Sequence, residues 1–232
     1  MFWCEQSRDV VRVVGPDAAT YLQSQLSQDI RPLVVGDSVW SFLLQPTGRV
    51  DVLLRVWRVA DDEFVLDTDS GFGEVMVARL QRFKIRVKAD IESLPWRCIA
   101  LRGGSFEVGL SAWGGGRDLL GADPVVPQGV RQGEPDELLA ARIEAVWPAM
   151  GAEIVPGDTI PAETGITDVA VSFRKGCYPG QELVERMDSR AAVAPKLLQH
   201  LSVYEAQALG ARVTSALAGR VLAYVPRRAL AD

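Results

Sequence analysis

The 232-residue sequence predicts an α+β fold in which antiparallel strands are grouped around helices. Several short segments alternate apolar and polar residues, which is typical of half-buried strands. A few other segments repeat their apolar residues at helical spacing. These helices do not follow every strand in turn, so the strict β-α-β alternation of a parallel sheet is not expected.

Composition excludes several other classes of protein. Hydrophobic residues make up 48% of the chain, enough for a sizeable core, so the chain as a whole is not intrinsically disordered. The 25 Lys+Arg and 30 Asp+Glu give a net charge of −5. This excludes a generally basic nucleic-acid-binding domain, although not a local cationic patch. No apolar run reaches the roughly 18 residues that a membrane span requires.

The first residues of the chain bear on its compartment. Glu5, Arg8 and Asp9 interrupt any apolar core of a signal peptide. We therefore expect a cytoplasmic protein that makes no use of a membrane.

The cysteines and the histidine limit the possible sites. Cys4, Cys98 and Cys177 are too few and too far apart for a disulfide framework or a self-contained zinc site, so no metal site is expected. The single histidine, His200, lies in a strand-like segment, which favours a structural role.

The first half of the chain predicts a strand, a helix and a meander. Residues 10–14 read as a strand, and Gly15-Pro16-Asp17 opens a helix with an apolar face. Segments 38–45, 50–56 and 64–66 alternate as strands separated by short turns. We expect these three strands to form an antiparallel meander.

A second helix and two strands are predicted next. Asp69 or Ser70 can cap the helix. Its apolar stripe consists of Phe72, Val75/Met76, Leu80 and Phe83. Strands are expected at 84–87 and 96–101.

The rest of the chain is richer in loops. Segment 102–134 carries much of the Gly and Pro and predicts loops around one or two short strands. Pro135 starts a helix that Pro148 ends, and a short helix is expected near 180–187. Three strands should follow, at 198–203, 211–215 and 219–225.

One short segment could carry chemistry through a cysteine. Cys177 lies shortly before a predicted helix N-terminus and two residues from Lys175, and both fields favour the thiolate. Burial would have the opposite effect. The alternative is a glycine turn, formed by Gly176 and Gly180, around an inert, small apolar cysteine. The segment reads Lys175-Gly176-Cys177-Tyr178-Pro179-Gly180-Gln181-Glu182.

Four cations alternate with apolar residues in a second segment. In a strand, Arg82, Lys84, Arg86 and Lys88 would lie on one face, about 6.6–7 Å apart, above an apolar underside. A solvated outer sheet face is one interpretation. The other is an anion track for a polyanionic ligand tail or for RNA phosphates.

A third feature is an arginine on an apolar stripe. Arg142 lies among the apolar residues of the helix that begins at Pro135. Its guanidinium needs a carboxylate or a ligand there, unless it reaches solvent at the edge of the stripe. Glu144 lies on another face of the helix and is not its obvious partner.

The segment at 175–182 resembles the signature of the YgfZ family, written K-G-C-[FY]-x-G-Q-E. Members of this family are folate-binding relatives of the aminomethyltransferase (T-protein) of the glycine cleavage system. Blocks at 15–30, 44–50, 142–145 and 160–163 resemble other parts of the family in the same order.

The resemblance implies the aminomethyltransferase folate-binding fold. Two modules, each an antiparallel sheet with helices, would surround a central channel that holds tetrahydrofolate, followed by a short C-terminal β segment. The first module would comprise 1–33 and 95–195, and the second 34–94. Residues 196–232 would form a short or truncated β-barrel-like tail, because small barrels need about five strands.

The resemblance also implies a function. YgfZ-like proteins support iron–sulfur cluster assembly or repair, and thereby tRNA modification, through the signature cysteine, here Cys177. One cysteine cannot hold a cluster alone, so a cluster would be transient and shared with a client or assembly protein. The cationic segment would hold the folate glutamate tail or contact RNA. The expected cofactor-binding residues are Lys175, Gly176, Tyr178, Gly180, Gln181, Glu182 and Arg142.

Two departures from the aminomethyltransferases leave an alternative open. Their acidic pair is replaced by Val52-Leu53, with Asp51 one step away, and their Y-T-G-E-D-G block has no counterpart in 100–120. A folate-dependent one-carbon transferase or demethylase would need a carboxylate, for which Asp51 or Glu163 is the candidate. A third hypothesis is an interaction module that has lost its ligand.

Overall fold

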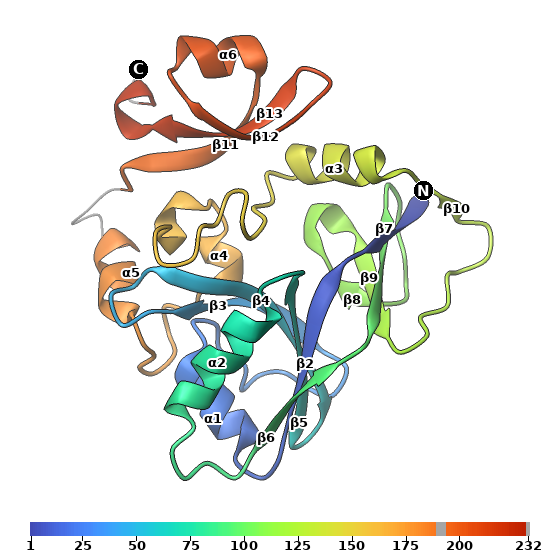
Figure 1. Ribbon diagram of the computed structural model, residues 1–232, viewed down its shortest axis with the longest axis vertical. Helices are drawn as coiled ribbons and strands as arrows, with labels where there is room; N and C mark the ends of the chain where they lie inside the picture. Colours follow the sequence, from blue (N-terminus) through green and yellow to red (C-terminus); the bar gives the residue numbers. More distant parts are fainter. Residues whose placement is uncertain (189–193, 231–232) are drawn as a thin grey trace.

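The computed structural model describes residues 1–188 and 194–230 and confirms the predicted α+β class (Figure 1). The strands are β1 (Phe2–Gln6), β2 (Arg8–Val14), β3 (Ser38–Leu44), β4 (Val50–Ala60), β5 (Glu63–Asp69), β6 (Asp90–Leu94), β7 (Arg97–Arg102), β8 (Leu110–Ser111), β9 (Arg117–Gly121), β10 (Arg131–Gln132), β11 (Lys196–Ser202), β12 (Arg212–Leu217) and β13 (Arg220–Pro226). The helices are α1 (Ala18–Gln25), α2 (Gly73–Phe83), α3 (Pro135–Glu144), α4 (Thr167–Ala170), α5 (Gln181–Asp188) and α6 (Val203–Ala208). Single 3₁₀ turns are η1 (Trp113–Gly115), η2 (Pro161–Glu163) and η3 (Arg227–Ala229).

The strands form two five-stranded sheets and one three-stranded sheet. We call the sheet with order β10-β1-β7-β9-β8 the first sheet, and the sheet with order β3-β4-β5-β2-β6 the second sheet. The predicted meander is confirmed as β3, β4 and β5, which pair antiparallel. Helices α1 and α2 pack on one face of the second sheet, where Tyr21, Leu22, Leu54, Met76 and Leu80 share a buried apolar cluster.

The chain changes sheets near its beginning. β1 pairs with β7 in the first sheet, and β2 pairs with β5 and β6 in the second. Residues 8–33 therefore lie with 34–94, and the predicted boundary at residue 33 does not separate the two sheets. Segment 102–134 holds three short strands, β8, β9 and β10, one more than expected.

The predicted strand at 84–87 is wrong. Helix α2 continues to Phe83, and residues 84–89 form a loop in which Arg86 has a φ of 59°. The side chain of Ile85 is 77% exposed, so the expected apolar underside does not exist. The carboxylate of Asp17 accepts a hydrogen bond from the backbone N–H of Lys88 at 2.7 Å, which holds this loop against the beginning of α1.

The cap of α2 also differs from the prediction. Neither Asp69 nor Ser70 caps the helix with its side chain. Instead, Asp9 of β2 accepts hydrogen bonds from the N–H groups of Gly71 and Gly73 at 2.8 and 2.7 Å. A carboxylate from a distant part of the sequence thus satisfies donors at the helix N-terminus.

Helix α3 starts where predicted but ends at Glu144, before Pro148. Val146 follows in a left-handed conformation with a φ of 52°. The N–H of Trp147 bonds the carbonyl of Arg142 at 3.1 Å, as in a Schellman motif. This motif usually places glycine where Val146 lies, so the sequence carries no glycine signal for the end of the helix.

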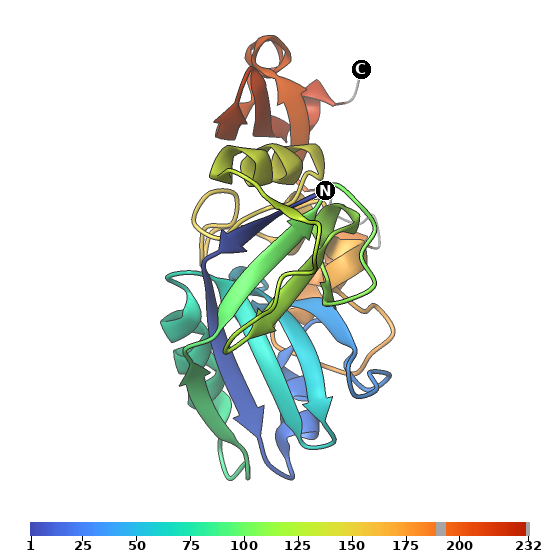
Figure 2. The same ribbon diagram turned by 90° about the vertical axis from the view of Figure 1, so that its right-hand side faces the viewer.

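The three predicted tail strands are confirmed as β11, β12 and β13. They form an antiparallel sheet of order β11-β13-β12, with α6 inserted after β11. Figure 2 shows this small sheet at one end of the molecule, above α3, and the two larger sheets below it. The half-buried His200 lies in β11 opposite Leu222, in agreement with a structural role.

Candidate functional site

The loop before α5 presents the one exposed cysteine of the chain. Cys177 is exposed, whereas Cys4 and Cys98 are buried. Burial raises the pKa of the Cys4 thiol, and it raises the pKa of the Cys98 thiol to about 12. Of the three thiols, only that of Cys177 therefore lies at the surface, where another molecule can reach it.

Lys175 anchors the loop on one side of the cysteine. Its side chain is buried, and its Nζ donates to the carbonyl oxygens of Gln23, Leu26 and Gln28 at 2.6, 2.5 and 3.2 Å. These carbonyls lie at the C-terminal end of α1, where the helix dipole favours a cation. Burial lowers the pKa of Lys175 to about 8. All three ammonium hydrogens are used, so none remains for the sulfur of Cys177.

Gly180 anchors the loop on the other side. It has a φ of 82°, and a Cβ there would lie 2.5 Å from the carbonyl oxygen of Gln45 and 2.8 Å from the Cα of Gly48. The loop thus packs directly on the turn between β3 and β4. Gly176 differs, because it has no positive φ and a Cβ there would meet nothing within 4 Å.

The other signature residues divide between the core and the surface. Tyr178 is buried in an apolar cluster with Trp147 and Val184, and burial raises its pKa to about 12. Gln181 donates to Glu185 at 2.5 Å on the exposed side of α5. The exposed Glu182 forms an ion pair with Arg186 at 2.6 Å.

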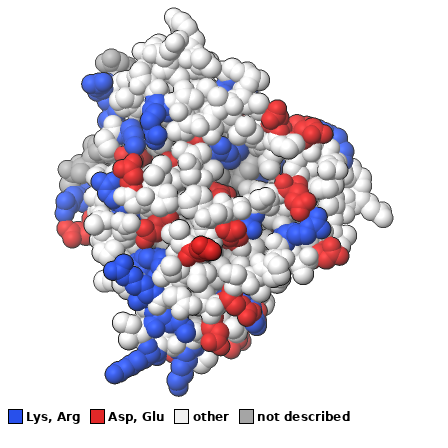
Figure 3. Space-filling model, in the orientation of Figure 1, with Lys and Arg blue, Asp and Glu red and all other residues white. Residues whose placement is uncertain are grey.

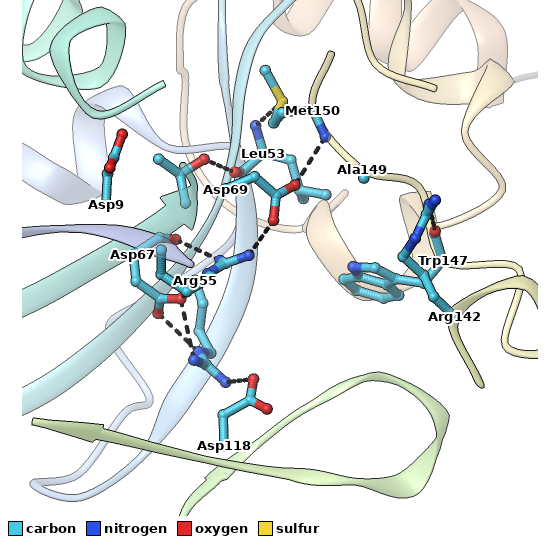
Figure 4. A network of polar contacts seen from close by, with 12 residues as sticks. Asp9, Leu53, Arg55, Asp67, Asp69, Asp118, Arg142, Trp147, Ala149 and Met150 are labelled. Carbon is cyan, nitrogen blue, oxygen red and sulfur yellow. Dashed lines mark hydrogen bonds and ion pairs between the residues drawn. The ribbon is translucent and has the colours of Figure 1, made fainter. Parts of the chain in front are cut away.

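A buried network of charges joins the two large sheets (Figure 4). Arg55 of β4 is fully buried, with Asp67 of β5 and Asp118 of β9 each 2.9 Å from its nitrogens. Arg8 pairs with Asp67, and Arg102 of β7 pairs with Asp118. Although burial opposes ionisation, Arg55 and Arg8 lower the pKa of Asp67. The network therefore holds the sheets in one relative position.

A cleft of about 240 Å³ lies beside this network, between the two sheets and α3. Its lining includes Gln6, Asp69, Trp113, Leu138 and Arg142. The Oε1 of Gln6 is buried and has no hydrogen-bond partner in the part of the chain that the structure describes.

Arg142 has a carboxylate partner, which is one of the alternatives that its sequence position left open. The Nη1 of Arg142 lies 2.7 Å from the carboxylate of Glu153, and its Nη2 donates to the hydroxyl of Ser215 in β12 at 2.6 Å. Burial favours the neutral carboxyl, but Arg142 and the hydrogen bonds to the carboxylate together outweigh this effect and lower the pKa of Glu153. As predicted, Glu144 is not the partner, since it pairs with Arg220.

The structure does not bring all predicted site residues together. Arg142 lines the cleft, but none of residues 175–182 does. Tyr178 and the cleft residue Trp113 nevertheless belong to one buried cluster, which connects the two places. The sequence analysis missed Gln6 and Asp69, for which no local pattern exists.

The two candidate carboxylates of the alternative function lie elsewhere. Asp51 pairs with Arg79 at 3.3 Å and accepts a hydrogen bond from Gln45. Glu163 lies 3.5 Å from Lys196, and burial raises its pKa. Neither residue lines the cleft.

Two features are absent from the described residues. Within residues 1–188 and 194–230, no three His, Cys, Asp or Glu side chains are grouped so that they could hold a metal ion. Over the same residues, no helix has the length and apolar character needed to cross a bilayer.

The fold is that of an aminomethyltransferase. The chain matches the glycine cleavage system aminomethyltransferase T of Bartonella henselae with a TM-score of 0.71, covering 97% of this chain and 78% of that one. Sequence identity is 18%, so this likeness concerns the fold alone. No family model matches the sequence.

The relatives by sequence are more specific. An uncharacterised protein of Haemophilus influenzae is 26% identical over 192 residues, which are 79% of this chain and 67% of that protein. The iron–sulfur cluster assembly factor IBA57 homolog of Pyricularia oryzae, described as mitochondrial, is 28% identical over 223 residues, which cover 85% of this chain. Human IBA57 is 27% identical over 224 residues and 82% of this chain.

The chain spans 56% of the length of the Pyricularia protein and 63% of human IBA57. These relatives, together with the fold, confirm the resemblance to the YgfZ family of aminomethyltransferase relatives.

Proposed function

We propose that this chain is an accessory factor for iron–sulfur cluster assembly or repair that acts through Cys177. The observation that carries the proposal is the exposed thiol on a loop whose two sides are fixed by Lys175 and Gly180. The names of the IBA57 relatives support the same role.

The chemistry of a thiolate suits this role. Thiolate is a soft ligand that iron–sulfur clusters use. A single cysteine leaves the remaining ligands to a second protein, which is a client or an assembly partner. The open space around Gly176 leaves room for that protein beside Cys177. The signature residues 175–182 serve, in this proposal, to present the thiol.

The cleft between the sheets supports the second part of the proposal, a reduced folate. Its volume of about 240 Å³ lies below the roughly 300–1,000 Å³ of typical ligand pockets, so it suits the flat pterin ring and not the whole molecule. The Oε1 of Gln6, which has no partner among the described residues, can accept a hydrogen bond from a ring N–H group. The carboxylate of Asp69 already accepts from Arg8 and from the N–H of Met150, and its remaining lone pairs can accept a further bond. Trp113 and Leu138 supply apolar walls, and Arg142 closes one side. A bound reduced folate would supply a carrier for one-carbon units.

We also propose that the protein acts in a reducing compartment. All three cysteines are free, which agrees with a reducing compartment such as the cytoplasm. The effect on tRNA modification would be indirect, through enzymes whose clusters this factor maintains. No observation favours the one-carbon transferase, because Asp51 and Glu163 are in ion pairs away from the cleft.

The cysteine role can be tested in cells that lack the protein. Cys177→Ala should lose all rescue of an iron–sulfur enzyme activity, such as the formation of thiolated tRNA nucleosides, because the cluster ligand is gone. Its stability should stay within about 0.5 kcal/mol of wild type, since the side chain is exposed. Arg174→Ala, an exposed neighbour outside the signature, is the matched control. Full rescue by Cys177→Ala would refute the role.

The folate role needs a separate test. Titration with tetrahydrofolate should change the tryptophan fluorescence, and Trp113→Phe should remove most of the change. Gln6→Leu should weaken binding about tenfold, because a buried hydrogen bond is lost. Binding that is unaffected by either substitution would contradict this assignment of the cleft.

A further inference from the structure

The cationic loop, which we define as residues 82–88 and which includes the last two residues of α2, carries four positive charges in seven residues. No carboxylate lies within ion-pairing distance of Arg82, Lys84, Arg86 or Lys88 among residues 1–188 and 194–230. Arg82 contacts only the ring of Phe83 among the interactions that the structure describes for it. By contrast, Lys175 in the loop before α5 uses all three of its ammonium hydrogens in bonds to backbone carbonyls. The charges of the cationic loop are thus available to a partner.

The loop also exposes an apolar side chain among these charges. Ile85 is 77% exposed, and its neighbour Arg86 has a left-handed φ of 59°, which is uncommon for a residue other than glycine. A hollow of about 210 Å³ lies beside the loop, and its lining includes Lys84, Val87, Lys88 and the acidic Asp90. An exposed apolar side chain next to a hollow and framed by cations is suited to a protein surface.

The loop packs against the beginning of α1. Residues 87–89 contact the beginning of α1: the N–H of Asp17 bonds the carbonyl of Lys88, and Gly15 packs against Lys88 and Ala89. The N-terminal end of a helix carries positive partial charge, but the carboxylate of Asp17 already lies there, so the attraction for anions rests on the four cations of the loop. Figure 3 shows Lys and Arg side chains projecting at this lower end of the molecule, with Asp and Glu side chains beside them. The whole chain has a net charge of −5, so the loop is a local reversal of sign.

We infer that the cationic loop is a docking surface for an acidic segment of a partner protein, with an apolar side chain of that segment packed on Ile85. Resting on the proposed function, the partner is the protein that shares a cluster with Cys177. Lys175 binds the C-terminal end of the same helix whose N-terminal end contacts the cationic loop. An eight-residue helix spans only about 12 Å, so one partner can contact both places.

A binding experiment with a defined probe tests this inference. The probe is a fluorescein-labelled synthetic peptide of twelve residues in which Glu alternates with Leu, measured by fluorescence anisotropy at 150 mM salt. Lys84→Glu/Arg86→Glu should weaken binding at least about tenfold, because two attractive charges become repulsive. Ile85→Ser should weaken it about three- to tenfold, because an apolar contact is lost.

The controls separate this surface from general charge effects. Arg227→Glu/Arg228→Glu makes the same change in net charge at η3 and should leave the affinity within about twofold. Equal loss in both double variants would overturn the inference. So would binding that is unaffected by Ile85→Ser, or an RNA oligonucleotide that binds as tightly as the peptide. Cys177→Ala should bind the peptide like wild type. The peptide experiment therefore tests the docking surface independently of the role proposed for Cys177.

Discussion

The loops at the two ends of α1 both carry lysines, but the structure uses these lysines in opposite ways. At the C-terminal end, Lys175 is 6% exposed and donates to three backbone carbonyls. At the N-terminal end, the side chains of Lys84 and Lys88 have no ion pair among the described residues, although the Lys88 backbone is bonded to Asp17. Charge at one end holds the fold together, and charge at the other end remains available for binding.

The comparison shows that a lysine near a cysteine need not act on it. Lys175 stands two residues from Cys177 in the sequence, yet its ammonium is directed at the end of α1. Its contribution is to position the loop. We therefore expect substitutions at the anchors of residues 175–182, the signature loop, to destabilise the protein, and substitutions in the cationic loop to leave its stability almost unchanged.

The largest effect on stability is expected at Gly180. Gly180→Ala should lower the free energy of unfolding by about 2–4 kcal/mol, because the new Cβ would meet the backbone of Gln45 at a positive φ. Gly176→Ala is the matched control and should change it by no more than about 0.5 kcal/mol, since the space there is open. Urea denaturation of both variants measures the difference. Equal effects would show that the loop is not held at Gly180.

A smaller loss is expected at Lys175. Lys175→Met should destabilise the protein by about 1–3 kcal/mol, because buried carbonyls at the end of α1 lose their donor. Hydrogen exchange in residues 172–180 should accelerate at the same time. Lys84→Met, which removes an unpaired lysine of the cationic loop, should cost no more than about 0.5 kcal/mol. An unchanged exchange rate in Lys175→Met would disprove the anchor.

The same lysine predicts a pH dependence. The folded protein releases the Lys175 proton at a pKa of about 8, whereas an unfolded chain holds it to about 10.4. Between these values the unfolded state binds more protons, so this group makes the free energy of unfolding rise with pH. Denaturation midpoints of wild type and Lys175→Met, measured from pH 7.5 to 10, should diverge in this window. Parallel curves would mean that the lysine is not buried.

The smallest effect is expected on α5. The ion pair between Glu182 and Arg186 is exposed, so Glu182→Ala should cost about 0.3–0.5 kcal/mol. A thermal denaturation curve would detect a larger loss. Such a loss would place Glu182 among the anchors of the signature loop.

The sequence was most informative where a pattern is local. The meander, the starts of α3 and α5 and the tail strands follow from periodicity and turn residues. The place of Arg142 on an apolar stripe indicated that it needs a carboxylate or a ligand unless it reaches solvent, and the structure supplies the carboxylate. The predictions that were wrong concern residues whose partners are distant in the sequence. Asp9 caps α2 from another strand, and Asp17 holds Lys88, so 84–87 is a loop. Val146 ends α3 in a conformation that usually indicates glycine.

The candidate site shows the same division. The signature identified Cys177 and its glycines, but it could not tell which glycine the fold requires. Gln6 and Asp69 come together only because the two sheets meet there. Arg55 and Asp67 lie within otherwise apolar strands, and a charge at an inward position of a strand could have indicated the buried network.

Alkylation of the native protein tests the central claim most directly. We predict that iodoacetamide modifies Cys177 and leaves Cys4 and Cys98 unmodified, and that peptide mass mapping finds one label per chain. Protein labelled in this way should no longer support the formation of an iron–sulfur enzyme in a reconstituted assay. A protected Cys177, or labelled protein with full activity, would contradict the account.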